Sequence, residues 1–433
     1  MTEEGVSTGR RTCLRRVALA VTAGLAGCAS LGGGTPTDRP TPTPTDEPTD
    51  TPTTTPTATD TSSPSPTPSP TPEVLADVSG TYPSVRYDAG RRAFAPGVTG
   101  PAESPPAGYA LDLPGGVYQP VVDGQRLYLA PRRRRSSEAT VEAFDLRRGT
   151  REWGVDLGSR ASAAPTVAGD RVFVQTAGGI YGLATDGTVE WSSRTVTGAG
   201  FAPTAVGDRV YAVGESGLAA YDAAGAQAWQ VPLTTRPLAA AAADESTVYL
   251  VLPRDQMTTD VLALDADDGG TAWRASVATE AGFPPVRAGD TVYVTSDRRQ
   301  GGVTALDADD GSELWTADIR LDYGTAVTAD RVVVADRERV YARSRTDGSA
   351  DWSTAIGADV VAGPVAGRDA VYVAIETRDG GGIRALSLDG GDGRWTRGFD
   401  RSVRTPVVVE NGLVVPTHDG EPGPERLHVA TTT

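Results

Sequence analysis

The sequence contains no lysine, although it is 433 residues long, and its 40 basic residues are therefore all arginines. Acidic residues number 56, so the formal net charge is −16. Dispersed carboxylates keep a folded protein hydrated and soluble. An acidic chain without lysine is typical of extreme halophiles. Its charge argues against nucleic acid as a partner, because binding the phosphate backbone requires a surplus of basic residues.

Cysteine and histidine are nearly as scarce. The two cysteines, Cys13 and Cys28, lie near the N-terminus, so the remaining chain cannot form a disulfide, a thiolate metal site or a cysteine nucleophile. His418 and His428 are the only histidines, too few nitrogen donors for a zinc cluster. No phosphate-binding glycine loop or Ser-His-Asp set is present either. These residues therefore predict no catalytic residue, no cofactor-binding residue and no metal ligand.

Residues 1–27 have the pattern of an export signal. Arg10 and Arg11 precede an uncharged apolar run over residues 17–27, which is too short to span a bilayer. The arginine pair resembles the twin-arginine export motif, although Cys13 stands where that motif favours an aromatic residue. The sequence therefore predicts a twin-arginine-type signal peptide and export from the cell.

A membrane anchor and a spacer follow the signal. The run "LAGC" ends at Cys28 and resembles a lipobox, in which the cysteine is lipidated and becomes the new N-terminus. We expect the anchor region over 28–34, then a Thr/Pro/Ser-rich disordered stalk over 35–72 and a lead-in segment over 73–106. These features predict a protein held on the extracellular face of the cell membrane through its lipid.

The remainder of the chain is built on a repeat of about 40 residues, a period typical of repeat architectures. Seven tryptophans mark it, and a glycine lies four residues before each one. An alanine lies ten residues before six of them, and the exception has Tyr181 there, one residue out of step with Gly182. The tryptophans are Trp153, Trp191, Trp229, Trp273, Trp315, Trp352 and Trp395.

Each unit also opens with a short β-branched and aromatic strand, such as "GDRVFV" at 169–174 and "GDTVYV" at 289–294. Four strands per unit, repeated radially, predict an all-β fold, a β-propeller of four-stranded antiparallel blades over 107–430 with a tail at 431–433. Eight strand openings against seven tryptophans favour eight blades, with seven as the alternative.

The ends of the repeat predict how the ring closes. The sequence "PPAGYALDLPGG" places Tyr109 where a tryptophan would stand, and Pro105 replaces the glycine four residues earlier. We expect this strand to pair with the C-terminal strands at 403–430, which removes the open sheet edges. The seven tryptophans recur at one strand position, which predicts that they dock blade against blade as part of the core.

The units "ALDADDGSELW", "ALDADDGGTAW" and "AFDLRRGTREW" resemble the pyrroloquinoline-quinone-type repeat. That family includes quinoprotein dehydrogenases and non-enzymatic propellers such as the lipoprotein of the outer-membrane β-barrel assembly machinery. The lead-in "YPSVRYDAGRRAF" at 82–94 is similar to that of archaeal members. The resemblance implies either a binding module without a cofactor or a dehydrogenase that uses pyrroloquinoline quinone with calcium.

Three functions remain open at this stage. A membrane-tethered, non-catalytic propeller that binds a protein or cell-envelope partner is favoured over a quinone-dependent dehydrogenase. The resemblance implies that such an enzyme holds calcium through Asp, Glu and Asn side chains, and Asn411 is the sole asparagine in the sequence. A binder of glycans or envelope polymers is the third class. The fold alone does not decide between them.

Two polar stretches stand out as possible sites. The basic run "PRRRRSSE" at 131–138 is a candidate partner-binding loop through Arg132, Arg133, Arg134 and Arg135, with the longer loops at 253–260 and 296–302 as secondary candidates. The acidic stretch at 305–315 resembles the start of a calcium loop, but its glycine arrives one position too early. The sister copies "GLATDGTVEW" and "AYDAAGAQAW" keep one aspartate each, so we interpret the stretch as a hairpin turn.

Overall fold

The computed structural model describes residues 75, 78–113, 115–132, 140–198, 200–215, 217–255, 258–278, 281–296, 302–420 and 425–432. The arginine pair Arg10 and Arg11, the lipobox Cys28 and the Thr/Pro/Ser-rich stretch lie outside these residues, as do residues 133–135. Within the described ranges every regular element is a strand, and no helix there is long and apolar enough to cross a membrane.

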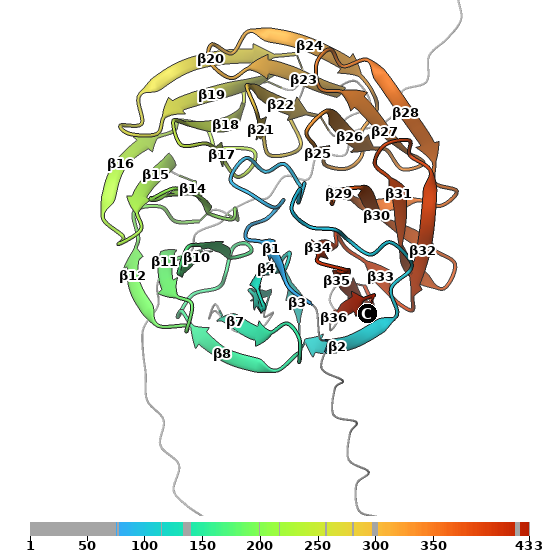
Figure 1. The fold of residues 1–433 in the computed structure, drawn as a ribbon. Helices are drawn as coiled ribbons and strands as arrows, with labels where there is room; N and C mark the ends of the chain where they lie inside the picture. Colours follow the sequence, from blue (N-terminus) through green and yellow to red (C-terminus); the bar gives the residue numbers. More distant parts are fainter. Residues whose placement is uncertain are drawn as a thin grey trace, which may run out of the picture. The chain divides into compact units, whose positions relative to one another are not determined.

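The described chain forms eight antiparallel blades that follow one another around a centre (Figure 1), which confirms the eight-bladed all-β prediction over the seven-bladed alternative. The strands of a blade are called a, b, c and d from the centre outward. Blade 1 contains β4 (Val121–Gly124), β5 (Arg126–Leu129), β7 (Thr140–Asp145) and β8 (Arg151–Asp156). Blade 2 contains β9 (Thr166–Ala168), β10 (Arg171–Thr176), β11 (Gly179–Ala184) and β12 (Val189–Ser193).

The next four blades repeat this order. Blade 3 contains β13 (Thr204–Val206), β14 (Arg209–Gly214), β15 (Gly217–Asp222) and β16 (Gln227–Pro232). Blade 4 contains β17 (Ala242–Ala243), β18 (Thr247–Pro253), β19 (Thr259–Asp265) and β20 (Thr271–Val277). Blade 5 contains β21 (Val286–Ala288), β22 (Thr291–Thr295), β23 (Gly302–Asp307) and β24 (Glu313–Asp318). Blade 6 contains β25 (Ala326–Val327), β26 (Arg331–Ala335), β27 (Arg339–Ser344) and β28 (Ala350–Ala355).

The last two blades bring the C-terminus back to the N-terminal part. Blade 7 contains β29 (Val360–Ala366), β30 (Ala370–Thr377), β31 (Gly380–Ser387) and β32 (Gly393–Phe399). Blade 8 contains β33 (Ser402–Val403), β34 (Val407–Val409), β35 (Gly412–His418) and β36 (Glu425–Thr431), and its d strand is β2 (Ala107–Leu113). Two further pairings involve β1 (Gly80–Tyr82), which lies on β4, and β3 (Gly116–Val117), which pairs with β6 (Pro131–Arg132).

Burial follows the position of a strand in its blade. The b strands are almost wholly buried, as in β14, where only the first residue, Arg209, is not buried, and the c strands are buried over part of their length. The outer d strands alternate, so that β16 buries Trp229 between exposed neighbours. Continuous apolar runs therefore form strands that are covered on both sides, and alternating runs form the outer edge.

The ring closes as the sequence predicts. Strand β2 pairs antiparallel with β36, with Tyr109 opposite Val429, so the first repeat strand completes the last blade. The seven indole groups and Tyr109 then form one cyclic series. Each ring donates its polar hydrogen to a backbone oxygen ahead of it, and Tyr109 Oη lies 2.6 Å from Leu146 O in blade 1. The indole Nε1 acceptors are Thr185 O, Ala223 O, Ala266 O, Ala308 O, Arg345 O, Leu388 O and Pro101 O.

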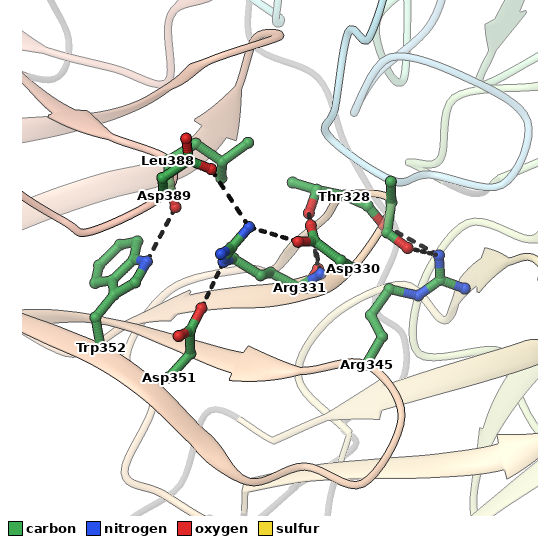
Figure 2. Close-up of polar contacts among 9 residues, drawn as sticks. Thr328, Asp330, Arg331, Arg345, Asp351, Trp352, Leu388 and Asp389 are labelled. Atoms are coloured by element: carbon green, nitrogen blue, oxygen red, sulfur yellow. Dashed lines mark hydrogen bonds and ion pairs between the residues drawn. The ribbon is translucent and has the colours of Figure 1, made fainter.

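Figure 2 shows one such junction, between blades 6 and 7. Trp352 Nε1 donates to Leu388 O at 3.0 Å. Beside it, Arg331 bridges the junction, with ion pairs to Asp330 and Asp351 in its own blade and to Asp389 in blade 7 at 3.6 Å. The contact between blades thus combines a buried aromatic hydrogen bond with exposed ion pairs, of which the aromatic contact contributes more because surface ion pairs are screened by water.

The repeated glycine lies in the c–d turn, directly against the tryptophan of the preceding blade. Gly311 has φ of +75°, and a Cβ placed there would lie 2.5 Å from the Trp273 ring. Both the left-handed backbone and the close ring contact therefore require glycine at this position. In the same turn Asp307 and Asp310 accept hydrogen bonds from the backbone N–H groups of Asp309 and Ser312, so these acids cap the turn.

The pairing of strands c and d shows which small residue lies opposite each tryptophan. In five blades that residue is the alanine ten positions before the tryptophan, as with Ala305 and Trp315. In blades 2 and 3 it is Gly182 and Ala220, nine positions before. The c–d turns of these two blades are one residue shorter, which explains why Tyr181 is out of step and why Ala219, ten residues before Trp229, lies opposite Gln230 instead.

Replacing Gly311 with alanine tests the turn contact. Both Gly311→Ala and Gly207→Ala force a left-handed alanine, which costs about 1–2 kcal/mol, but nothing lies within 4 Å of a Cβ at Gly207. We expect Gly311→Ala to lower the free energy of unfolding by about 1–3 kcal/mol more, because its methyl group meets the Trp273 ring. Urea unfolding measures both, and equal losses would contradict the packing role.

Candidate functional site

The antiparallel blades give the ring two distinct faces. The chain reverses between successive strands, so the b–c hairpins and the d–a connections lie at one end, here called the b–c face. The a–b and c–d turns lie at the other end, called the a–b face. The first described residue, Leu75, exchanges hydrogen bonds with Arg147 in the c–d turn of blade 1, so the described chain begins at the a–b face.

The segment 78–106 passes through the centre of the ring, as the blue trace in Figure 1 shows. It bonds to blade 1 through β1 and to blade 3 through Arg91. Its backbone bonds to the inner strand of the other six blades, each close to the a–b turn. These pairs are Pro83 O with Val167, Ala89 O with Ala243, Gly90 O with Arg287, Arg92 O with Val327, Ala93 O with Ala366 and Ser79 O with Glu410. The lead-in segment therefore fills the channel at the a–b face.

Arg91 anchors the lead-in segment. Its side chain is 1% exposed, and its three nitrogens donate to backbone carbonyls of blades 3 and 4, to Val85 O, and to Thr204 Oγ1 at 2.7 Å. Burial lowers the pKa of Arg91 to about 10, so the group stays charged at neutral pH. The backbone of the lead-in segment is strained, because φ lies between 50° and 82° at four residues other than glycine: Arg86, Tyr87, Arg91 and Ala93. The hydrogen bonds to the blades hold this backbone in place.

Above the lead-in segment the channel opens into a cavity of about 180 Å³, here called the axial cavity. Tyr82, Arg86 and Ala93 of the lead-in segment line it on one side. The remaining lining comes from strand β29 and from d–a connections. These residues are Gln119, Phe283, Tyr323, Gly324, 361–365 and Thr405. The axial cavity thus occupies the part of the channel that faces the b–c end.

A larger cavity of about 480 Å³, here called the rim cavity, adjoins it. The two share Gln119, Val361, Ala362 and Thr405 in their linings, so they lie side by side. The rim cavity lies among blades 7, 8 and 1. Its other lining residues are Val117, Tyr118, Arg132, Ile375, Glu376, Gly380, Gly381, Ser402, Val403, Arg404, Pro416 and His418.

A buried carboxylate, that of Glu425, hydrogen-bonds to two residues that line the rim cavity. Glu425 is 2% exposed and accepts hydrogen bonds from Val117 N at 2.7 Å and from Arg404 Nε at 3.1 Å. Arg132 lies over the ring of Tyr118, with its guanidinium carbon 4.3 Å from the ring centroid. Two arginines thus line the rim cavity, and their positions are set by packing within the fold.

The structure places Arg132 of the basic run in this lining, on β6, while residues 133–135 lie outside the described part. The run joins strands b and c of blade 1, and the loops at 253–260 and 296–302 join strands b and c of blades 4 and 5. All three loops therefore open onto the b–c face. Sequence reasoning missed Tyr82, Gln119 and Arg404, because only the folded ring brings the lead-in segment beside the last blades.

The cavity residues do not fit a calcium-held quinone. Calcium takes about six to eight oxygen ligands, but within the described ranges no group of three or more Asp, Glu, His or Cys side chains could hold a metal ion. The sole asparagine, Asn411, lies with φ of +54° in the a–b turn of blade 8, so it lies on the face opposite the cavities. The lining donors are mainly arginines and neutral groups, which suit an anion better than a cation.

These features define the class: an eight-bladed β-propeller that is filled at one face by its own N-terminal segment and has a cavity at the other. The family model described as "Outer membrane protein assembly factor BamB" matches residues 102–249, 257–300 and 299–422, and the chain therefore belongs to that family. The family agrees with the resemblance of the units to pyrroloquinoline-quinone-type repeats. No curated protein sequence matches the chain.

Solved structures share the fold at low sequence identity. The quinohemoprotein alcohol dehydrogenase from Comamonas testosteroni is 14% identical, with TM-score 0.64, over 81% of this chain and 80% of that one. BamB from Moraxella catarrhalis is 17% identical, with TM-score 0.58, over 76% of this chain and 100% of that one. A europium-containing methanol dehydrogenase is 12% identical, with TM-score 0.60, over 81% of this chain and 98% of that one. Enzymes and a non-enzymatic propeller are thus alike in fold, which leaves function to the site.

The two histidines lie in blade 8. His418 ends β35 and lines the rim cavity, where its Nδ1 accepts a hydrogen bond from Gly420 N. His428 lies in β36 with its ring centroid 5.0 Å from that of Phe399 in blade 7. Burial lowers the pKa of His428 to about 4, and the positive charge of Arg426 contributes to the shift. The imidazole of His428 is therefore neutral at neutral pH.

The lowered pKa of His428 predicts that the stability of the protein depends on pH. In the unfolded chain His428 titrates near its ordinary value of 6.5, so the unfolded state binds the proton more tightly than the folded state. The free energy of unfolding should therefore fall as the pH is lowered from 6.5 towards 4, the value in the fold. Urea unfolding at about pH 7 and about pH 5 should show a larger loss for the native protein than for His428→Gln. A His418→Gln control should keep the full loss, and identical losses in the native protein and His428→Gln would contradict the assignment.

Proposed function

We propose that this protein is a non-catalytic binding module, tethered to the outside of the cell membrane, that holds a protein partner on its b–c face. The observation that carries the proposal is the rim cavity, which three blades form together and which carries two arginines in fixed positions. Binding sites are typically concave and combine an apolar lining with a few placed polar groups. Arg132 and Arg404 supply such groups here.

The positions of the long loops also favour the b–c face as the partner-binding face. The b–c connections of blades 1, 4 and 5 lie on the same face of the ring as the cavities, whereas a–b connections such as 169–170 and 207–208 are tight turns. Loops on a rigid scaffold are where recognition residues gather. The described chain begins beside the c–d turn of blade 1, on the face opposite these loops.

The family supports a protein partner as the first choice. The matching family model is described as an outer membrane protein assembly factor, which indicates a role in binding other proteins at a cell envelope. The anchor at Cys28 and the export motif at Arg10 and Arg11 would place this chain in a comparable position, on the outside of the cell membrane. A cell-envelope polymer is the alternative occupant of the same face.

Site-specific photo-cross-linking in intact cells tests the proposed face. A cross-linking residue at Glu376, which lines the rim cavity and is exposed, should yield a discrete protein adduct. The same residue at Asp208, an exposed acid in an a–b turn, is the matched control and should yield none. Equal adducts from both positions, or an adduct from Asp208 only, would contradict the proposal.

The basic loop gives a second arm of this test. Changing Arg132, Arg133, Arg134 and Arg135 to serine should reduce the adduct formed from Glu376 by roughly tenfold, as expected for the loss of several charged contacts. Changing Arg194 and Arg236 to serine removes exposed charge from the same face, in the connections that follow blades 2 and 3, away from the rim cavity. That control should leave the yield unchanged.

A further inference from the structure

Two arginines of the lead-in segment are positively charged groups without an ion pair inside the described ring. Arg91 is surrounded by carbonyl and hydroxyl oxygens, and Arg86 donates from Nε to Arg91 O and from Nη2 to Thr325 O. Their neighbour Arg92, in contrast, forms an ion pair with Asp88 at 2.5 Å. In a protein with net charge −16, a cation held beside a cavity without a carboxylate is unusual and attracts an anion.

Arg86 has one nitrogen left for a ligand. Its Nε and Nη2 atoms are used by backbone carbonyls, while Nη1 makes no hydrogen bond within the described chain and the residue lines the axial cavity. Burial lowers the pKa of Arg86 to about 10, which leaves the guanidinium charged at neutral pH. Backbone carbonyls hold the group in place but do not neutralise its charge.

Two more donors lie at the same cavity. The Tyr82 hydroxyl and the Gln119 amide nitrogen are buried and make no hydrogen bond to any described residue, and Tyr82 is 0% exposed. Burial raises the pKa of Tyr82, and the positive charge of Arg86 and the nearby Gln119 amide offset part of that rise. The Gln119 amide therefore lies near the Tyr82 hydroxyl, although the two do not meet hydrogen-bond geometry. Buried polar groups without partners are rare in folded proteins and call for an explanation.

We propose that the axial cavity is a binding site for a carboxylate, held by Arg86, Tyr82 and Gln119. This assignment rests on the proposed function, because it gives the chemical group that the b–c face recognises. The Arg86 guanidinium and the Gln119 amide nitrogen can only donate, and the Tyr82 hydroxyl can donate as well, so the three groups together favour a ligand with acceptor oxygens. One guanidinium matches the single charge of a carboxylate. Arg86 Nη1 can donate to one carboxylate oxygen, and the Tyr82 hydroxyl and the Gln119 amide can donate to the other.

The size of the site limits the ligand. A volume of about 180 Å³ holds roughly six water molecules at about 30 Å³ each, which is the space of a small organic acid or of one terminal residue. The rim cavity, which adjoins the axial cavity and is lined by Arg404 and Arg132, offers further contacts to the rest of a longer chain. The carboxylate has two possible sources, the C-terminus of a partner polypeptide and a free organic acid.

Equilibrium dialysis of the full protein separates these sources. The probes are short peptides of random sequence with a free C-terminus, the same peptides with an amidated C-terminus, and succinate, all at constant high ionic strength. Retention of the free-acid peptides but not of the amidated ones identifies a chain terminus, and retention of succinate identifies a free acid. If neither the free-acid peptides nor succinate is retained, the proposal is overturned.

Four variants locate any binding that is seen. Tyr82→Phe removes only the hydroxyl and should weaken binding roughly three- to tenfold. Arg86→Gln should weaken it about tenfold or more. Tyr211→Phe removes an equally buried hydroxyl without a partner, in blade 3 away from the cavity, and should change nothing. Arg194→Gln, on an exposed arginine that follows blade 2 and lines neither cavity, is the charge control and should also change nothing.

Binding that survives both Tyr82→Phe and Arg86→Gln would overturn the proposal, and Tyr82→Phe decides the matter alone if Arg86→Gln does not fold. The binding experiment and the cross-linking experiment test different proposals, so their results can be told apart. Carboxylate binding without an adduct from Glu376 would support the carboxylate site and contradict the proposed partner-binding face. An adduct from Glu376 that is unaffected by Tyr82→Phe and by competing carboxylates would support the partner-binding face and contradict the carboxylate site.

Discussion

The blades of this ring are held together by aromatic side chains that donate their polar hydrogens to backbone oxygens beyond their own blade. Six tryptophans and Tyr109 bond to the neighbouring blade in this way, and Trp395 of blade 7 bonds instead to Pro101 O of the lead-in segment. Each contact between blades combines the burial of a large ring with a directional bond, so it fixes both the distance and the angle between blades. The turn glycines, such as Gly311, exist because the ring of the preceding blade lies where a side chain would begin.

Closure of the ring makes its centre available to another part of the chain. The lead-in segment occupies the a–b end of the channel and bonds to every blade, directly through its backbone or through Arg91. Such a segment ties the eight blades together independently of the contacts between neighbours. It also supplies Tyr82 and Arg86 to the axial cavity, so the element that closes the channel also provides part of the binding chemistry.

The repeat was readable from the sequence because its physical requirements fall at fixed positions in every unit. Trp315, Gly311 and Ala305 have one structural role each, and a period near 40 residues exposes them. Tyr109 was predicted as the eighth member from its place before the first unit, and β2 pairs as expected. The shift to Gly182 and Ala220 was not predictable from the tryptophan spacing, because it depends on turns that are one residue shorter.

The candidate site was far less predictable. Arg86 and Tyr82 are more than 30 residues from Gln119 in the sequence, and no periodicity connects them. Their meeting depends on left-handed backbone at Arg86 and Tyr87 and on anchoring bonds to several blades, which arise only in the folded ring. The acidic stretch at 305–315, which attracted attention in the sequence, instead caps a turn with Asp307 and Asp310.

The central claim is that the lead-in segment builds a donor-lined, positively charged chamber in the channel of the propeller. The most direct measurement is anomalous diffraction from crystals of the protein soaked in bromide, an anion that scattering locates without ambiguity. The account predicts a bromide peak in the axial cavity, in contact with Arg86 and beside Tyr82 and Gln119. Bromide confined to exposed arginines on the outside of the ring, with none in the axial cavity, would contradict it.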